Sequence, residues 1–230
     1  MLGFFLINKP KGITSHDVVG YLRRITGEKT IGHAGTLDPL AEGLMIVAIG
    51  REFTKRISEF SKLDKEYMAE ATLGAISTTY DAEGDITPSN LPLVRGGEVG
   101  LPTPQEEDVM EVLQGFVGKQ GQMPPIYSAK KIKGQKAYNL ARQGKAVELV
   151  PVPINIYEIK LLNYRYPLLK FSVKVSSGTY IRSLVHDLGQ KLGVGAYMSG
   201  LIRTTVGDYK LEQAIDLYQI KSVVDLHLVI

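Results

Sequence analysis

Residues 31–50 read IGHAGTLDPLAEGLMIVAIG, and this stretch says more about the fold than any other. Residues 44–49 form an unbroken apolar run of strand length between two glycines, which predicts a buried core strand. Before this run, Gly32 and Gly35 allow the chain to turn sharply and to lie close to a ligand. Asp38 precedes Pro39, which directs its backbone toward an extended or turn geometry. We therefore predict a shaped loop that carries one carboxylate and is mounted on a rigid strand.

Asp38 has two interpretations at this point. Catalytic groups are commonly held on loops that a rigid scaffold positions, and this loop fits that description. An Asp before a Pro is also a common way to start an ordinary turn. The local pattern by itself favours the ordinary turn, so the function of Asp38 depends on the rest of the chain.

The composition is that of a globular protein. The chain has 230 residues, of which 44% are hydrophobic and 22% are charged. This length allows one large domain or two small ones. There is no Cys, which excludes disulfides and cysteine-based zinc sites or nucleophiles. The apolar run at the N-terminus is too short for a signal peptide, and no stretch approaches the about 18 apolar residues of a membrane span. We expect a cytoplasmic protein.

The spacing of apolar residues predicts alternating short helices and strands. A helix is expected between a cap at Thr14 or Ser15 and a stop at Gly27. Further helices are expected at residues 53–60, 104–116, 182–192 and 211–217. Strands are expected at residues 3–7, 65–74, 147–163, 169–176 and 201–206. Residues 84–104 hold four Gly and four Pro, so a long loop is expected there. Because the chain shows no repeat and no strict strand–helix alternation, we predict an α+β (mixed α/β) fold with a largely antiparallel sheet flanked by helices.

A basic segment lies at residues 119–145. It holds seven Lys or Arg residues and no Asp or Glu, with Tyr127 and Tyr138 among them. Basic residues interleaved with aromatic ones suit a phosphate backbone with a base or two to stack. A solvated basic face explains the same pattern equally well, and the net charge of only +3 does not decide between them.

Motifs for the common cofactor sites are absent from the sequence. No Walker phosphate loop and no Gly-x-Gly-x-x-Gly before a helix occur. The four His residues lack helical ligand spacing, and no Gly-x-Ser-x-Gly elbow is present. A reaction without a metal or an organic cofactor is the simplest enzyme class that remains.

Four blocks of sequence, in this order, resemble the bacterial tRNA pseudouridine synthase B family. They are GHAGTLDPLAEG at residues 32–43, KEY at 65–67, PIYSAK at 125–130 and GTYIRSL at 178–184. The resemblance runs from about residue 5 to residue 217. It implies the pseudouridine synthase fold, with residues 1–230 as the catalytic domain and residues 119–145 as an RNA-clamping insertion. The C-terminal RNA-binding domain of many relatives is expected to be absent.

The resemblance also implies a reaction. It is the isomerisation of the uridine at position 55, in the T loop of tRNA, to pseudouridine after the base has flipped out. Asp38 would be the catalytic carboxylate, either attacking C1′ of the ribose or removing the C2′ proton. Arg182 would pair with that Asp and keep it ionised. Tyr67 would stack on the target base.

Further residues have roles by resemblance alone. His33, Lys9 and Tyr180 would line the RNA-binding pocket, and Lys130, Lys131 and Lys133 would contact phosphates. The partner would be the T-stem-loop of tRNA, with no cofactor, metal or membrane, and the protein is expected to be a monomer. The competing hypothesis is a non-catalytic tRNA-binding or tRNA-folding module on the same fold. Asp38 separates the two, because a binder has no need of a carboxylate beside an RNA backbone.

Overall fold

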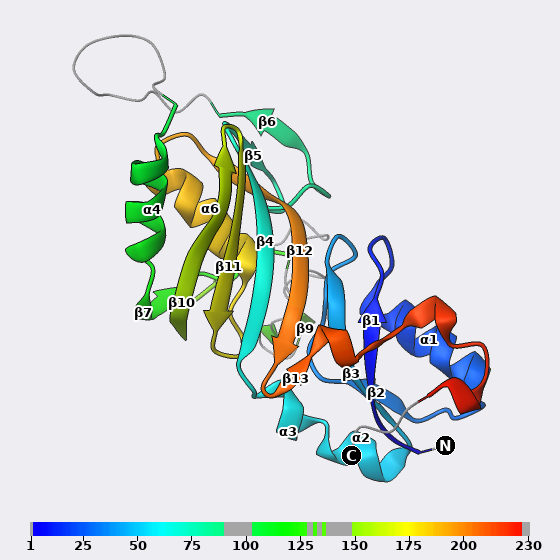
Figure 1. Ribbon diagram of the computed structural model, residues 1–230. Helices are drawn as coiled ribbons and strands as arrows, with labels where there is room; N and C mark the ends of the chain where they lie inside the picture. Colours follow the sequence, from blue (N-terminus) through cyan, green and yellow to red (C-terminus); the bar gives the residue numbers. More distant parts are fainter. Residues whose placement is uncertain (1, 90–102, 128–130, 133–134, 137–148, 227–230) are drawn as a thin grey trace, which may run out of the picture. The chain divides into compact units, whose positions relative to one another are not determined.

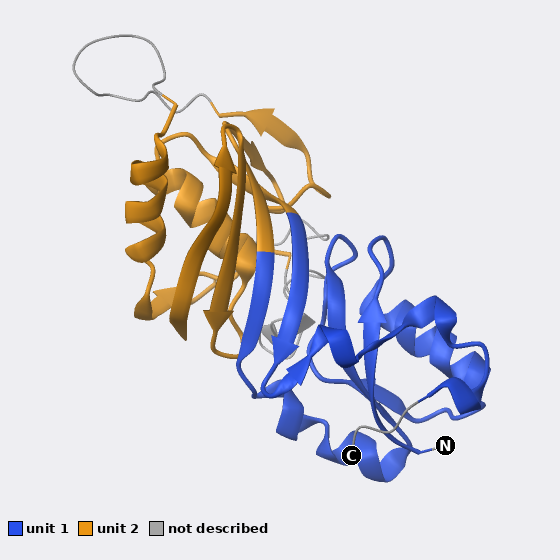
Figure 2. Cartoon of the chain, in the orientation of Figure 1, with its two compact units in different colours: residues 1–68, 200–230 blue, residues 69–199 orange. Residues whose placement is uncertain are grey.

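The computed structural model describes residues 2–89, 103–127, 131–132, 135–136 and 149–226 (Figure 1). The chain divides into two compact units, which are coloured separately in Figure 2. Unit 1 holds residues 1–68 and 200–230, and unit 2 holds residues 69–199. Two strands, β4 (Lys65–Leu73) and β12 (Ala196–Val206), contribute residues to both units.

The strands of unit 1 follow the order β14-β1-β3-β12-β4. β3 pairs antiparallel with β1 and parallel with β12, and β1 pairs parallel with β14. β2 adds to β3, and β13 adds to β12. The remaining strands are β1 (Gly3–Lys9), β2 (Ile31–His33), β3 (Glu42–Ile49), β13 (Tyr209–Lys210) and β14 (Ile215–Asp216).

The β1–β3 pair is buried on both faces, which explains the unbroken apolar run at residues 44–49. On one face Phe5 and Ile7 pack with Met45 and Val47 beneath α1 (Ser15–Thr26). On the other face Phe4, Leu6, Leu44 and Ile46 pack with Phe60 and Val206. Successive side chains of a strand point to opposite faces, so one continuous apolar run supplies the buried residues of both faces. The predicted core strand is confirmed.

The helices of unit 1 follow the sequence signals at their ends. Thr14 and Asp17 form a reciprocal capping box at the start of α1, and Gly27 ends the helix with a φ of +70°. The helix expected at residues 53–60 is two short helices, α2 (Arg51–Arg56) and α3 (Ser58–Ser61).

The prediction of a helix at residues 211–217 is wrong. The chain instead forms two 3-10 turns, η1 (Leu211–Gln213) and η2 (Leu217–Gln219), on either side of β14, and a third, η3 (Val223–Asp225), follows. The backbone of β14 pairs with β1 at Ile7 and Asn8, and this pairing overrides a helical propensity spread over only two turns.

The strands of unit 2 follow the order β4-β11-β10-β7, and two small hairpins, β5–β6 and β8–β9, lie outside this order. The pairs β10–β11 and β10–β7 are antiparallel. The elements are β5 (Ala75–Ser77), β6 (Ile86–Pro88), α4 (Glu106–Gln114), β7 (Gly118–Gln122), β8 (Lys131–Ile132), β9 (Gln135–Lys136), β10 (Val152–Arg165), β11 (Leu168–Val175) and α6 (Ile181–Lys191).

Burial in unit 2 follows the predicted periodicities. The apolar set that alternates along β11 is buried, as are the inward positions of α6, and α4 packs against both β10 and α6. Residues 84–104 were expected to be a loop, but Ile86–Pro88 pairs with β5 as β6, and residues 90–102 lie outside the described residues.

The α+β prediction with a largely antiparallel sheet is confirmed. Of the strand pairs with a resolved register, only β1–β14 and β3–β12 are parallel among the residues that the structure describes. No described helix has the length and hydropathy of a membrane span.

Candidate active site

The Asp38 loop connects β2 to β3, and both chain neighbours of Asp38 are hydrogen-bonded to the start of unit 1. The hydroxyl of Ser15 donates to the carbonyl of Leu37 at 2.9 Å and accepts from the Leu37 N–H at 2.8 Å. The N–H of Gly12 donates to the carbonyl of Pro39 at 2.8 Å. Asp38 itself is half-buried. The carboxylate is therefore carried on a backbone that is fixed on each side, as preorganised catalysis requires.

A buried guanidinium joins the two ends of the same loop. Arg203 is 1% exposed, and its Nε donates to the carbonyl of Leu44 at 2.7 Å. Its Nη2 donates to the carbonyl of Gly35 at 3.2 Å. Gly43 has a φ of +105°, and a β-carbon there would lie 2.4 Å from the carbonyl oxygen of Arg203. Only glycine allows β12 to approach the start of β3 this closely.

Lys9 holds the turn that supports the loop. Its side chain is fully buried, and its ammonium donates to the carbonyls of Pro10 at 3.0 Å and Ile13 at 2.6 Å. The same turn contains Gly12, which bonds to Pro39. These contacts shape the support of Asp38. The RNA contact expected of Lys9 stays a prediction.

Tyr67 lies on the buried face of β4, where it is 8% exposed. Lys65 is two residues earlier on the same face, and its ammonium donates to the carbonyls of Ser61 and Leu63. Burial, aided by the nearby Arg203 charge, lowers the pKa of Lys65 to about 8, although Asp64 opposes this.

His33 ends β2 and is half-buried. Burial holds the pKa of His33 below its usual value of 6.5, against a hydrogen bond to the Gly35 backbone, and the Arg203 and His16 charges lower it further. The ring is therefore neutral at pH 7. This suits the predicted RNA contact, which needs no proton carrier.

Arg182 lies in the first turn of α6, and a carboxylate that the sequence did not point to faces it. Nη1 of Arg182 is 3.2 Å from Oδ2 of Asp81, and both side chains are buried. Arg182 also donates to the carbonyls of Thr79 at 3.2 Å and Tyr127 at 3.0 Å. Asp81 accepts further hydrogen bonds from the Thr79 hydroxyl and the Glu83 N–H. The guanidinium is thus held in one orientation by acceptors on two loops.

A buried amide holds the start of α6. The side chain of Gln122, at the end of β7, accepts from the N–H of Tyr180 at 2.8 Å and donates to its carbonyl at 2.9 Å. The hydroxyl of Ser183 donates to the carbonyl of Met123 at 2.8 Å. Tyr180, the residue before α6, is therefore fixed through its backbone, and Arg182 follows two residues later.

The predicted residues fall in both units. Lys9, His33, Asp38 and Tyr67 belong to unit 1, where Lys9 and the Asp38 loop are linked through the turn at residues 10–13. Tyr180 and Arg182 belong to unit 2 and are neighbours at the start of α6. Lys130 and Lys133 lie outside the described residues, and of Lys131 only the backbone is described, as part of β8.

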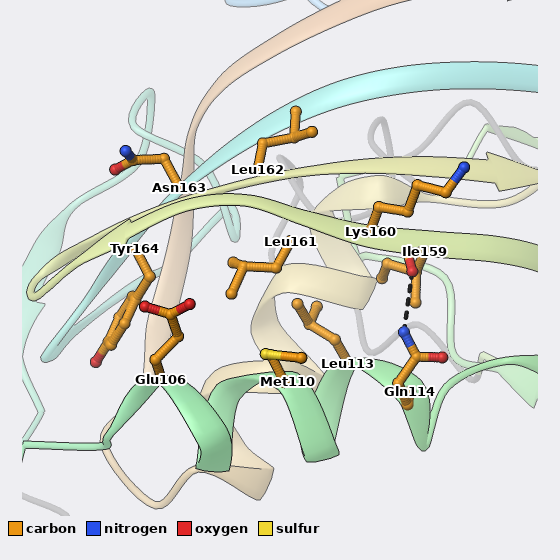
Figure 3. Close-up of a pocket in the computed structure, with 10 residues that line it drawn as sticks. All are labelled: Glu106, Met110, Leu113, Gln114, Ile159, Lys160, Leu161, Leu162, Asn163 and Tyr164. Atoms are coloured by element: carbon orange, nitrogen blue, oxygen red, sulfur yellow. Dashed lines mark hydrogen bonds between the residues drawn. The ribbon is translucent and has the colours of Figure 1, made fainter.

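A groove between α4 and β10 carries none of these residues. It has a volume of about 480 Å³, and Figure 3 shows its α4 side chains facing those of β10, with the Gln114 amide bonded to the Ile159 carbonyl. In the ranges that the structure describes, no group of three or more His, Asp or Glu side chains is placed to hold a metal ion.

Two protein-family models match the chain. The family model described as "TruB family pseudouridylate synthase (N terminal domain)" matches residues 23–181. The model described as "tRNA pseudouridylate synthase B C-terminal domain" matches residues 182–227. The chain belongs to the TruB family of pseudouridylate synthases. The enzyme class predicted from the sequence is therefore confirmed.

Curated TruB relatives match almost the whole chain. A tRNA pseudouridine synthase B of Protochlamydia amoebophila is 47% identical over 97% of this chain and 81% of its own length. Proteins of the same name from Thermosipho melanesiensis and Caldanaerobacter subterraneus are 44% and 46% identical, over 69% and 74% of their own lengths. The resemblance found in the four sequence blocks thus extends well beyond them.

Solved structures confirm the pseudouridine synthase fold. A chain of a crystallised Cbf5–Nop10–Gar1 complex is 30% identical and superposes with a TM-score of 0.72 over 95% of this chain. A chain of an H/ACA ribonucleoprotein bound to a substrate RNA containing 2′-deoxyuridine gives a TM-score of 0.67 at 28% identity. This TruB chain spans about half the length of each of those chains.

Several residues around the site escaped the sequence reasoning. Asp81 is followed by Ala, Glu and Gly84, which has the pattern of an ordinary turn. Ser15 reads as part of a helix cap, Gln122 as part of the basic segment, and Arg203 as a strand residue. No local signal distinguishes any of the four, because each acts on a partner far away in the sequence.

Proposed function

We propose that this TruB chain isomerises the uridine at position 55 in the T loop of tRNA to pseudouridine, with Asp38 as the catalytic carboxylate. Membership of the family supports the reaction class, and the names of the curated relatives support tRNA as the substrate. The target position follows from the resemblance of the four sequence blocks. The same membership favours the enzyme over a module that only binds or folds tRNA.

The observation that carries the proposal is the fixed backbone on each side of Asp38. Ser15 bonds to Leu37, and Gly12 bonds to Pro39, so the loop that holds the carboxylate does not have to be ordered when RNA binds. A carboxylate that only started a surface turn would need no such anchors. Fixed geometry of this kind lets a group act on a substrate atom that is presented to it.

Asp38 would act at the ribose of the flipped nucleotide. In one route its carboxylate attacks C1′ as the N1–C1′ bond breaks, and the uracil leaves as an anion. In the other route it removes the C2′ proton as the N1–C1′ bond breaks, and a glycal forms. In both routes the uracil turns over and C5 bonds to C1′. In the first route C5 displaces the Asp38 carboxylate from C1′, and in the second C2′ regains its proton as the glycal double bond is used. The proton on C5 is then lost to solvent while N1 gains one. The reaction is an isomerisation, so it needs no redox partner.

Two further residues would serve the same step. Tyr67 offers a ring on a rigid strand, and stacking the extruded base on it would offset part of the cost of unstacking. Arg182 would favour the ionised form of Asp38, because a guanidinium near a carboxylate lowers the pKa of the carboxyl group. His33, Lys9 and Tyr180 are proposed contacts of the RNA, as are Lys130, Lys131 and Lys133.

The test is Asp38→Asn, which keeps the size of the side chain and removes its charge and basicity. We expect no measurable release of tritium from tRNA labelled at uridine C5, while tRNA binding stays within about twofold of wild type. Asp208→Asn is the matched control, since Asp208 is an exposed Asp of the same unit and should keep full activity.

The product is then mapped by sequencing pseudouridine in the treated tRNA without any added cofactor. Pseudouridine at a position other than 55 would contradict the proposed target. Full turnover by Asp38→Asn would contradict the role of Asp38. Binding of tRNA by the wild type without any pseudouridine would instead favour the non-catalytic module.

A further inference from the structure

The turn that presents Asp81 to Arg182 has a strained backbone. Tyr80 has a φ of +65°, and it is the only non-glycine residue with a positive φ among those that the structure describes. The β-carbon makes this left-handed region unfavourable, and a residue stays there only when its surroundings hold it. Such residues cluster at functional sites, so the contacts that hold Tyr80 are informative.

The first of these contacts is made by the backbone. The N–H of Met198 donates to the carbonyl of Tyr80 at 2.9 Å, and the N–H of Ala82 donates to the carbonyl of Met198 at 3.0 Å. Asp81 thus lies between two backbone hydrogen bonds to the same residue. These bonds fix the path of the chain but leave the distance to α6 unspecified.

The second contact is a ring stack that reaches α6. The Tyr80 ring lies on the His186 imidazole with centroids 3.9 Å apart and an interplanar angle of 14°. His186 comes four residues after Arg182 on α6, so both side chains project from the same face of the helix. The segment that carries Asp81 and the helix that carries Arg182 are therefore joined twice, by the ion pair and by the stack.

The environment of His186 suits a neutral stacking ring. Its Nδ1 is buried without a hydrogen-bond partner among the described residues. Burial lowers the pKa of His186, although the adjacent Asp187 carboxylate opposes this, so the imidazole is uncharged at pH 7. The His186 ring stacks on Tyr80 although its Nδ1 makes no hydrogen bond among the described residues. The ring is therefore best explained by the stacking contact itself.

We propose that Tyr80 and His186 are positioning residues for the Asp81–Arg182 ion pair. The stack fixes the separation between the turn and α6, and so it fixes the direction in which the guanidinium points. This inference rests on the proposed function, because it takes Arg182 to act in the isomerisation. Neither ring needs to touch the RNA for this role.

The test compares variants that remove the aromatic ring at residue 80 or 186 (ring-free variants) with variants that retain a ring there (ring-keeping variants). Tyr80→Gly removes the ring and suits the positive φ, so it adds no backbone strain. Tyr80→Phe keeps the ring, and His186→Ala and His186→Phe form the same contrast on α6. The readouts are the rate constant of pseudouridine formation in a single turnover, the affinity for tRNA and the melting temperature.

We expect Tyr80→Gly and His186→Ala each to lower the single-turnover rate constant by about fivefold, with tRNA affinity within about twofold of wild type. The two ring-keeping variants should recover most of the rate. The double variant Tyr80→Gly/His186→Ala should lose no more than the worse single variant, because both remove the same contact.

If the wild type is active, three outcomes would contradict the positioning role of Tyr80 and His186. One is a wild-type rate constant in both ring-free variants, and another is an equal loss in the ring-keeping variants. The third is a reduced reaction amplitude with an unchanged rate constant, which shows that the stack serves folding alone. A wild type that forms no pseudouridine contradicts the proposed function instead, so the two failures are distinguishable.

Discussion

Arg182 shows at the scale of one residue why the site needs a guanidinium. Its Nη1 forms an ion pair with the Asp81 carboxylate and donates a hydrogen bond to the Thr79 carbonyl, and its Nη2 donates to the Tyr127 carbonyl. The planar fork of arginine meets acceptors in different directions with little loss of rotamer freedom. An ammonium at the end of a lysine is a compact point charge and cannot reproduce this pattern. The ion pair is buried, so loss of the Asp81 charge would remove part of the charge compensation of the guanidinium.

We predict that Asp81→Asn lowers both stability and activity. The amide keeps the shape of the carboxylate but removes its charge from beside a buried guanidinium. The free energy of unfolding should fall by about 1–3 kcal/mol, measured by urea denaturation. The single-turnover rate constant should fall by at least about tenfold, since Arg182 would no longer be held in place.

Asp85→Asn provides the control for this prediction. Asp85 is exposed and lies four residues later in the same segment, so its substitution should change neither quantity. A rate constant for Asp81→Asn equal to that of Asp85→Asn would show that the buried carboxylate is irrelevant to the reaction.

The Asp38 loop is best understood at the scale of elements, because three of them anchor it. The start of α1 supplies Ser15, the turn after β1 supplies Gly12, and β12 supplies Arg203. The loop is therefore held rigidly by the β1–β3 pair, which is packed on both of its faces. A loop so anchored resists local opening, whose cost is the loss of buried hydrogen bonds.

Ser15→Ala should loosen this loop. The substitution leaves the N–H and the carbonyl of Leu37 without their partner in a place where Leu37 is 3% exposed. The expected loss is about 1–3 kcal/mol of unfolding free energy, together with a lower single-turnover rate constant. Hydrogen exchange at the Leu37 amide measures the loosening directly.

Ser58→Ala is the matched control, since Ser58 is exposed at the start of α3. Exchange at Leu37 that stays as slow in Ser15→Ala as in Ser58→Ala would mean that α1 does not anchor the loop.

Charge is the property that matters at the scale of the whole molecule. The net charge is only +3, so attraction to RNA has to come from the distribution of charge. The basic segment at residues 119–145 is the strongest local concentration of positive charge that the sequence offers. Most of it lies outside the described residues, so its role is tested in solution.

We predict that the triple variant Lys130→Ala/Lys131→Ala/Lys133→Ala binds tRNA more weakly and with a shallower dependence on salt. Each lost phosphate contact should reduce the slope of log K against log[salt] by about 0.7–0.9, giving a total change of about 2–3 for three contacts. The control removes three exposed lysines of unit 1, Lys55, Lys62 and Lys221. Equal slopes for the two triple variants would show that residues 119–145 are only a solvated face.

Stability should depend on pH through two histidines. Burial lowers the pKa of His33 and of His186, so the native state binds their protons less readily than the unfolded state does. Their contribution is fully present above the unfolded pKa of about 6.5 and is lost as the pH falls below it. The melting temperature should therefore be lower at pH 5.5 than at pH 7.5.

His186→Phe isolates one part of this effect, because it keeps a ring on α6 and cannot take up a proton. The variant should show a smaller drop over the same interval. Burial raises the pKa of Asp187, which acts in the opposite direction at lower pH, so the interval ends at pH 5.5. An identical drop in His186→Phe and wild type would assign the effect to His33 or to other groups.

Local periodicity and composition are sufficient to predict several elements of this chain. The core strand at residues 44–49, the buried face of β4 and the alternation of β11 follow from hydrophobic spacing, because burial selects one face of an element. The cap and the end of α1 follow from the residue types at its ends. The glycine-bounded loop around Asp38 and the family resemblance were also readable in the chain.

The pairing of distant side chains follows from the fold and cannot be predicted from local sequence. Arg182 reaches Thr79 across 103 residues, and Arg203 reaches Gly35 across 168. The 3-10 turns around β14 replaced a predicted helix because the backbone at residues 215–216 pairs with β1. Asp81, Ser15 and Gln122 carry no local signal, since a hydrogen bond between distant segments depends on where the core places them. The spacing of apolar residues along the chain reflects which face of an element is buried. Which distant polar groups form hydrogen bonds depends instead on how the elements pack together.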